Sequence, residues 1–173
     1  MESLNKLFES KKTVPFTIIT FLIITIIRIY FLFSSQISDS LFKVNIPKSL
    51  EFIIAIIFLF INLVYIILAV NITYALIFFL NKKINNNEFK LYGIKNICYI
   101  AYLIPLIVNS IFIIFYMLTT GTIIKDVYIN TILVNLIISL LLSFMLKYKI
   151  NIKKIYIIVP IIIFIINSLL IIF

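Results

Sequence analysis

The chain has 173 residues, of which 64% are apolar and only 12% are charged, and its mean hydropathy is +1.26. A soluble domain carries about 25% charged residues, so this composition excludes one and indicates an integral membrane protein. The net charge of +9 does not indicate nucleic-acid binding, because no basic, aromatic-rich soluble segment exists to carry it.

Five apolar runs are long enough to cross a bilayer, which takes about 20 residues as a helix. The second is the longest, and it contains no glycine, proline or charge between Glu51 and Lys82, so we expect one helix there rather than two. The sequence therefore predicts an all-α polytopic membrane protein, a five-transmembrane-helix bundle that forms a single membrane domain over 1–173. Its expected helices are about 14–34, 50–80, 97–118, 128–147 and 155–173.

The distribution of lysines predicts the orientation of these helices. Short loops rich in Lys and Arg stay cytoplasmic. Three clusters would share one side: Lys6, Lys11 and Lys12; Lys82, Lys83, Lys90 and Lys95; and Lys147, Lys149, Lys153 and Lys154. The opposite side would carry Lys43, Lys48 and Lys125. We therefore expect a multi-pass protein of the cell membrane with its N-terminus cytoplasmic and its C-terminus outside, in contact with anionic membrane lipids at the basic loops.

The residue types needed for catalysis at membrane depth are missing from the apolar runs. The chain contains no histidine, the commonest general base and metal ligand. Its six carboxylates fall in loops or at expected helix ends: Glu2, Glu9, Asp39, Glu51, Glu88 and Asp126. Only two glycines are present, so a phosphate-binding loop cannot be built. We therefore expect a protein that is not an enzyme and that has no cofactor or metal.

Arg28 is the one charge inside an apolar run. It lies six residues before Ser34, at the expected outer end of the first helix. One interpretation is that its side chain extends outward to the lipid headgroups. The other is that it faces the bundle or a partner subunit, because intramembrane charges commonly mark functional sites.

Small polar residues recur every four positions along the fourth run, at Thr131, Asn135, Ser139 and Ser143. Each step of four turns a helix by about 400°, so these side chains form one slowly drifting stripe. Small and hydroxylated residues let membrane helices approach closely and form hydrogen bonds. The stripe predicts packing inside the protein or docking on another membrane protein. Possible polar partners within the chain are Asn62, Asn71, Asn109, Ser110, Asn167 and Ser168.

The segment Ala75–Ile107 resembles the YIP (Ypt-interacting protein) family of five-helix membrane proteins, short bacterial type. The matching features are Phe89 and Lys90 in the connection, then Tyr102 and Pro105 in the next helix; Met145–Val159 is similar to the family's last inner loop. The glycines common in the family's connection are replaced here by Asn85, Asn86 and Asn87. The resemblance implies a non-enzymatic partner protein, and one bacterial branch accompanies MacB-type ABC exporters that protect against toxic peptides.

Together these features predict an accessory or scaffold subunit that binds another integral membrane protein, with an ABC transporter as the expected partner. The expected partner-binding residues are Arg28, Thr131, Asn135, Ser139 and Ser143. Two alternatives remain open. One is the substrate-binding membrane subunit of an energy-coupling vitamin importer, although such subunits usually have six helices. The other is a bacteriocin immunity protein that acts alone.

Overall fold

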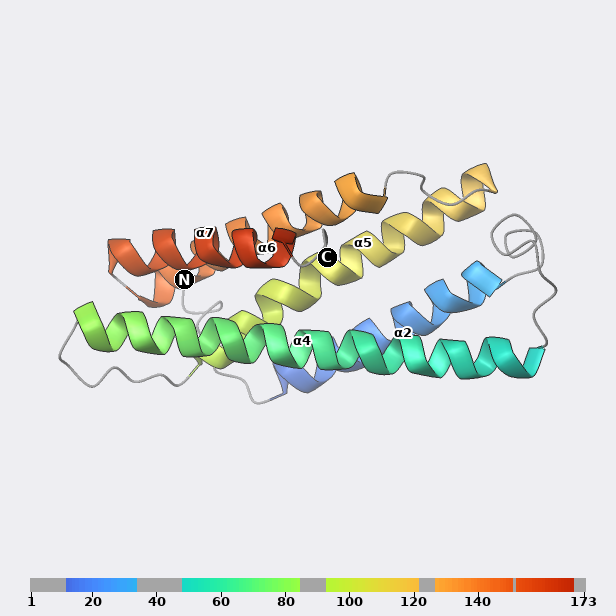
Figure 1. Ribbon diagram of the computed structural model, residues 1–173, viewed down its shortest axis with the longest axis horizontal. Coiled ribbons are helices and arrows are strands. Elements are labelled where there is room, and N and C mark those ends of the chain that lie inside the picture. The colour runs from blue at the N-terminus through green and yellow to red at the C-terminus, as the bar shows by residue number, and fades with distance from the viewer. Residues whose placement is uncertain (1–11, 34–47, 85–92, 122–126, 151, 170–173) are drawn as a thin grey trace.

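The computed structural model describes residues 12–33, 48–84, 93–121, 127–150 and 152–169, and these residues form five α-helices and no strand (Figure 1). The helices are α2 (Thr13–Phe33), α4 (Lys48–Ile84), α5 (Ile94–Thr120), α6 (Val127–Lys149) and α7 (Lys153–Leu169). The predicted all-helical architecture is confirmed, and each helix end lies within four residues of its expected position. The last four residues of the expected fifth helix lie outside the described part of the chain.

Four of these helices are long and apolar enough to cross a membrane. The apolar spans are Thr13–Leu32, Leu50–Lys83, Ile94–Thr120 and Ile129–Lys149. The described part of α7 has 17 residues, about 25 Å at 1.5 Å per residue, which is short of a typical crossing. The long second run is one uninterrupted helix of 37 residues, as the absence of helix breakers predicts. The number, length and apolar composition of these helices support the interpretation that this is a membrane protein.

Helix α5 is the centre of the bundle. It packs against α2, α4 and α6, while α6 in turn packs along α7 (Figure 1). Successive helices run in alternating directions, and the two cap residues of α5, Gly93 before its start and Gly121 after its end, lie at opposite ends of the bundle. Both glycines have positive φ, 90° and 64°, the left-handed conformation in which glycine is favoured at helix ends. We refer to the two ends of the molecule as the Gly93 end and the Gly121 end.

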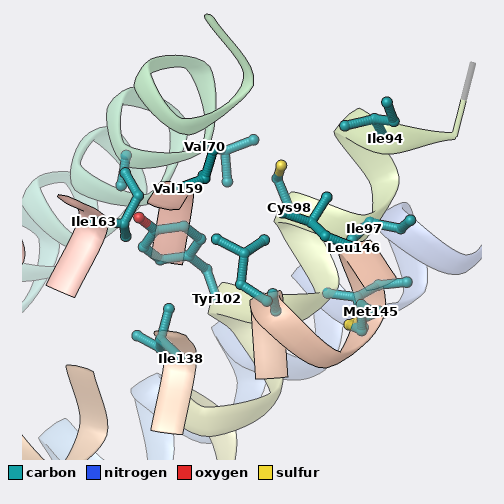
Figure 2. Close-up of a cluster of buried hydrophobic side chains, with 14 of the residues drawn as sticks. Val70, Ile94, Ile97, Cys98, Tyr102, Ile138, Met145, Leu146, Val159 and Ile163 are labelled. Carbon is teal, nitrogen blue, oxygen red and sulfur yellow. The ribbon is translucent and has the colours of Figure 1, made fainter. Parts of the chain in front are cut away.

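The buried core lies where α4, α5, α6 and α7 meet (Figure 2). Val70 of α4, Cys98 of α5, Leu146 of α6 and Val159 of α7 are completely buried there. The ring of Tyr102 passes through this cluster, and its hydroxyl points toward α7. Lipid is as apolar as these side chains, so close packing and hydrogen bonds must hold the helices together.

Helix α4 is packed along only part of its length. Between Ile66 and Asn81 it buries one regular stripe, formed by Ile66, Ala69, Val70, Thr73, Ile77 and Asn81. No residue from Leu50 to Tyr65 is buried. The segment 50–65, at the Gly121 end, therefore extends beyond the packed core with most of its surface uncovered.

Exposed lysines gather at the Gly93 end. Lys82 and Lys83 end α4, Lys95 begins α5, and Lys153 and Lys154 begin α7; all five are exposed. The folded chain thus brings together, at one end of the bundle, lysines of two clusters that are far apart in sequence, those around 82–95 and 147–154.

Candidate functional site

The guanidinium of Arg28 lies within the bundle, between α2, α4 and α5. Its Nη1 atom donates a long hydrogen bond of 3.4 Å to the hydroxyl of Ser110 on α5. Its central carbon lies 6.0 Å from the ring centroid of Phe58 on α4, the outer limit of a cation–π contact. Its Nε atom is buried and has no hydrogen-bond partner among the described residues. The structure therefore places this side chain against protein rather than extended toward the nearby end of α2.

The direction of Arg28 has a simple geometric cause. In an α-helix, each Cα–Cβ bond tilts toward the N-terminus of the helix. Arg28 lies near the C-terminal end of α2, so its side chain leans back toward the middle of the bundle. A side chain that reaches the nearby headgroups would have to turn against this tilt.

The polar stripe of α6 faces other helices of the same chain. Asn135 and Ser139 are buried, at 3% and 7% exposure, and Thr131 and Ser143 are partly buried. The Nδ2 atom of Asn135 and the hydroxyl of Ser139 have no hydrogen-bond partner among the described residues. The fold thus gives this stripe the internal-packing role, and a partner could contact its buried members only after α6 separated from its neighbours.

Ser143 connects α6 to α7 through a carbonyl that proline leaves free. Pro160 lies inside α7 and has no N–H, so it cannot satisfy the carbonyl oxygen of Tyr156 four residues earlier. The hydroxyl of Ser143 donates to that oxygen at 2.7 Å. This hydrogen bond fixes the position of one helix along the other.

A buried chain of hydrogen bonds joins α4, α5 and α7. Asn167 Nδ2 donates to the hydroxyl of Tyr102 at 3.3 Å, and that hydroxyl lies 3.1 Å from Thr73 Oγ1. Thr73 donates its only hydroxyl hydrogen to the carbonyl oxygen of Ala69 at 2.8 Å. Tyr102 must therefore donate to Thr73 and accept from Asn167. The hydrogen bonds therefore run in one direction, from Asn167 through Tyr102 and Thr73 to the carbonyl oxygen of Ala69. Each of the two hydroxyls both donates and accepts a hydrogen bond.

This arrangement differs from the partnerships expected for the polar residues. Asn167 bonds to Tyr102, and Ser110 bonds to Arg28, so neither is paired with the α6 stripe. Asn62 and Asn71 donate to the carbonyl oxygens of Phe58 and Ile67, four residues earlier on their own helix. The described polar side chains therefore serve several separate helix contacts rather than one seam.

Two grooves adjoin helix α4. The first, about 420 Å³, lies between α2 and the uncovered half of α4, and Tyr30, Glu51 and Ala55 are among its lining residues. The second, about 430 Å³, lies between α4 and α7, with Tyr65, Tyr102 and Asn167 among its lining residues. Ile72 and Ile166 complete the second groove on either side. Both volumes are within the range of small-molecule sites.

Within the described residues, no three His, Cys, Asp or Glu side chains come close enough to hold a metal ion. Cys98 is a free, fully buried thiol inside the core. No family model, curated protein or solved structure matches this chain.

Proposed function

We propose that this protein is a non-enzymatic accessory or scaffold subunit that binds another integral membrane protein. The observation that carries the proposal is the uncovered segment 50–65 of α4 beside the groove to α2. Exposed apolar side chains alone would suit lipid, but this groove is also lined by a carboxylate, Glu51, and by a small residue, Ala55. Small residues let a second helix approach closely, and a polar group offers it a hydrogen bond.

The orientation in the membrane is part of the proposal. We propose five crossings, with the Gly93 end cytoplasmic and the C-terminus outside. The exposed lysines at that end support this orientation through the preference of basic loops for the cytoplasm. The α2–α4 groove would then open in the outer half of the bilayer.

For the partner class, we propose an ABC-type exporter of the MacB type, acting in protection from toxic peptides. This step comes from the resemblance of the Tyr102 and Pro105 region to the YIP family.

The test is co-purification from native membranes in mild detergent, with two matched variants. Ala55→Phe fills the groove, whereas Ile53→Phe adds bulk to an exposed position that does not line it. We expect a complex of fixed stoichiometry for the wild type and for Ile53→Phe, and its loss for Ala55→Phe with the protein still monodisperse. Equal recovery of the complex with both variants would contradict docking at this groove.

A second candidate function is favoured by the α4–α7 groove. A substrate-binding subunit of a vitamin importer requires a cavity among its helices, and this groove has suitable volume with Tyr65 and Asn167 in its lining. A panel of vitamins added to purified protein tests this alternative. A thermal shift with one vitamin that Ala69→Phe abolishes would favour the importer subunit over the scaffold.

A further inference from the structure

We infer that Arg28 recognises an anion, and that this anion is a carboxylate on a membrane-spanning helix of the partner. The inference rests on the proposed function. It adds which chemical group of the partner is recognised, a carboxylate, and which residue of this protein binds it. It is based on the depth of the guanidinium, on its incomplete set of hydrogen bonds and on the direction of its side chain.

The contacts of the guanidinium lie deep in the bundle. Phe58, which contacts the guanidinium, lies about 15 Å along α4 from its start at Lys48, at 1.5 Å per residue. Ser110, its hydrogen-bond partner, lies about 15 Å along α5 from its end at Thr120. Both contacts are thus far from the Gly121 end of an apolar bundle. In a hydrocarbon layer of about 30 Å centred on these helices, the charge would lie at hydrocarbon depth.

Most of the hydrogen-bonding capacity of Arg28 is unmet among the described residues. A guanidinium has five N–H donors and cannot lose its charge in proteins. Among the described residues, Arg28 has one hydrogen bond, to Ser110 at 3.4 Å, and one aromatic contact, with Phe58. Its Nε is buried without an acceptor, and within the described part of the chain no carboxylate pairs with it. Intramembrane charges normally have a partner, and none of the described residues supplies an anionic one to Arg28, so the site would be completed by an anion.

The position and direction of the Arg28 side chain favour a carboxylate over a lipid phosphate. A guanidinium matches the planar fork of a carboxylate and also binds phosphate. Lipid phosphates, however, lie at the headgroup level, and the Arg28 side chain leans back from the nearby end of α2. A carboxylate carried by a membrane helix can reach this depth without pulling a headgroup into the core.

The position is also accessible from the side of the bundle. Arg28 is only partly buried, and the neighbouring Phe58 is 44% exposed. A partner helix that packs on the exposed ring of Phe58 would bring its carboxylate beside the guanidinium.

The test uses a defined probe in place of the native partner. A leucine-rich transmembrane peptide with one central Asp is compared with the same peptide carrying Asn, in phosphatidylcholine liposomes that contain the full-length protein. Energy transfer to a dye at Lys83→Cys, in a Cys98→Ala background, reports association. We expect the Asp peptide to bind at least about tenfold more tightly, equivalent to about 1.4 kcal/mol. Arg28→Gln should reduce its affinity to that of the Asn peptide.

A stability measurement on the free protein tests the same inference independently. If the charge lacks an anion, Arg28→Met should leave the melting temperature in detergent unchanged or higher, because an uncompensated charge is removed and the length of the side chain is kept. A marked fall would show that Ser110 and Phe58 already satisfy Arg28, and would overturn the inference. Ser110→Ala is the control, and it should have little effect because its hydrogen bond is long.

The remaining outcomes are also decisive. Equal binding of the Asp and Asn peptides, or full Asp-peptide binding by Arg28→Gln, would refute the carboxylate. Native mass spectrometry examines the lipid alternative: retention of phosphatidylglycerol that depends on Arg28, without preference for the Asp peptide, would assign the site to lipid phosphate. Because these tests use no native partner, they can fail while the groove-dependent complex of Ala55 stands.

Discussion

The hydroxyl of Ser143 on α6 occupies the place of a missing backbone donor at Tyr156 on α7, 2.7 Å from its carbonyl oxygen. Pro160 removes the N–H that would normally bond to this oxygen, and the neighbouring helix replaces it. A proline that would weaken an isolated helix thereby becomes a specific contact between two helices.

Removal of the Ser143 hydroxyl should destabilise the protein. Ser143→Ala leaves the Tyr156 carbonyl without a donor, and we expect a loss of about 1 kcal/mol in the free energy of unfolding. The matched control is Ser139→Ala on the same stripe, because the Ser139 hydroxyl has no partner within the described part of the chain and its removal should be neutral or slightly stabilising. Unfolding of the two variants by SDS in mixed micelles measures the difference. Equal losses would show that the hydrogen bond contributes nothing specific.

The role of Pro160 can be tested by a double-mutant cycle. Pro160→Ala restores an N–H for the Tyr156 carbonyl, so Ser143→Ala should cost less in that background. We expect a coupling energy of about 0.5–1 kcal/mol from the four unfolding free energies. Additive effects would mean that Ser143 and Pro160 act independently.

Tyr102 should be more important for stability than Tyr65. Tyr102→Phe leaves the Asn167 amide and the Thr73 hydroxyl without their shared partner, and we expect a loss of about 1–2 kcal/mol. The hydroxyl of Tyr65 has no hydrogen bond within the described residues, so Tyr65→Phe should change little. Thermal unfolding in detergent compares the two variants. A smaller loss of stability for Tyr102→Phe than for Tyr65→Phe would contradict the proposed stabilising role of these buried hydrogen bonds.

Gly121 should tolerate Asn better than Ala. Its φ is +64°, a conformation that L residues rarely adopt, although a Cβ there would meet no atom within 4 Å. Gly121→Ala should therefore cost about 1 kcal/mol through backbone strain alone. Gly121→Asn should cost less, since Asn also occurs in this conformation at helix ends. Identical melting temperatures for the wild type and Gly121→Ala would refute this.

The orientation can be measured by cysteine labelling in a Cys98→Ala background. Thr120 and Lys83 are both exposed; Thr120 ends α5 and Lys83 lies one residue before the end of α4, and these two helix ends lie at opposite ends of the bundle. An impermeant thiol reagent added to intact cells should label Thr120→Cys and leave Lys83→Cys unlabelled until the membrane is opened. The reverse pattern would invert the proposed topology.

The helices were predictable because membrane crossing imposes a length and a composition that each run displays by itself. The unbroken α4 follows from the lack of any helix breaker, and the glycines fall where α5 starts and stops. The buried faces were not predictable in the same way, since a helix that is apolar all round carries little periodicity to separate lipid from protein contact. Ile66 is buried and Ile67 is exposed, for example, although the two side chains are identical.

The candidate site was only partly predictable for a related reason. Arg28 and the four residues of the α6 stripe were identifiable as polar groups in apolar runs, but their surroundings depend on how the helices meet. The free carbonyl of Tyr156 follows from Pro160, whereas its donor depends on the position of α6 along α7. The hydrogen bonds of Tyr102 were missed. A tyrosine far from both ends of an apolar run was the available indication that a buried partner exists.

The length of α4 has a consequence for the membrane itself. Its apolar span of 34 residues is about 51 Å long, whereas the hydrocarbon core is about 30 Å thick. Even at a tilt of about 40°, the upper end of the usual range, the span would still cover about 39 Å of the bilayer normal. The surrounding lipids must stretch to cover the excess, or apolar turns of α4 must leave the hydrocarbon. This hydrophobic mismatch favours thicker bilayers and gives the protein a preference among membranes that depends on thickness alone.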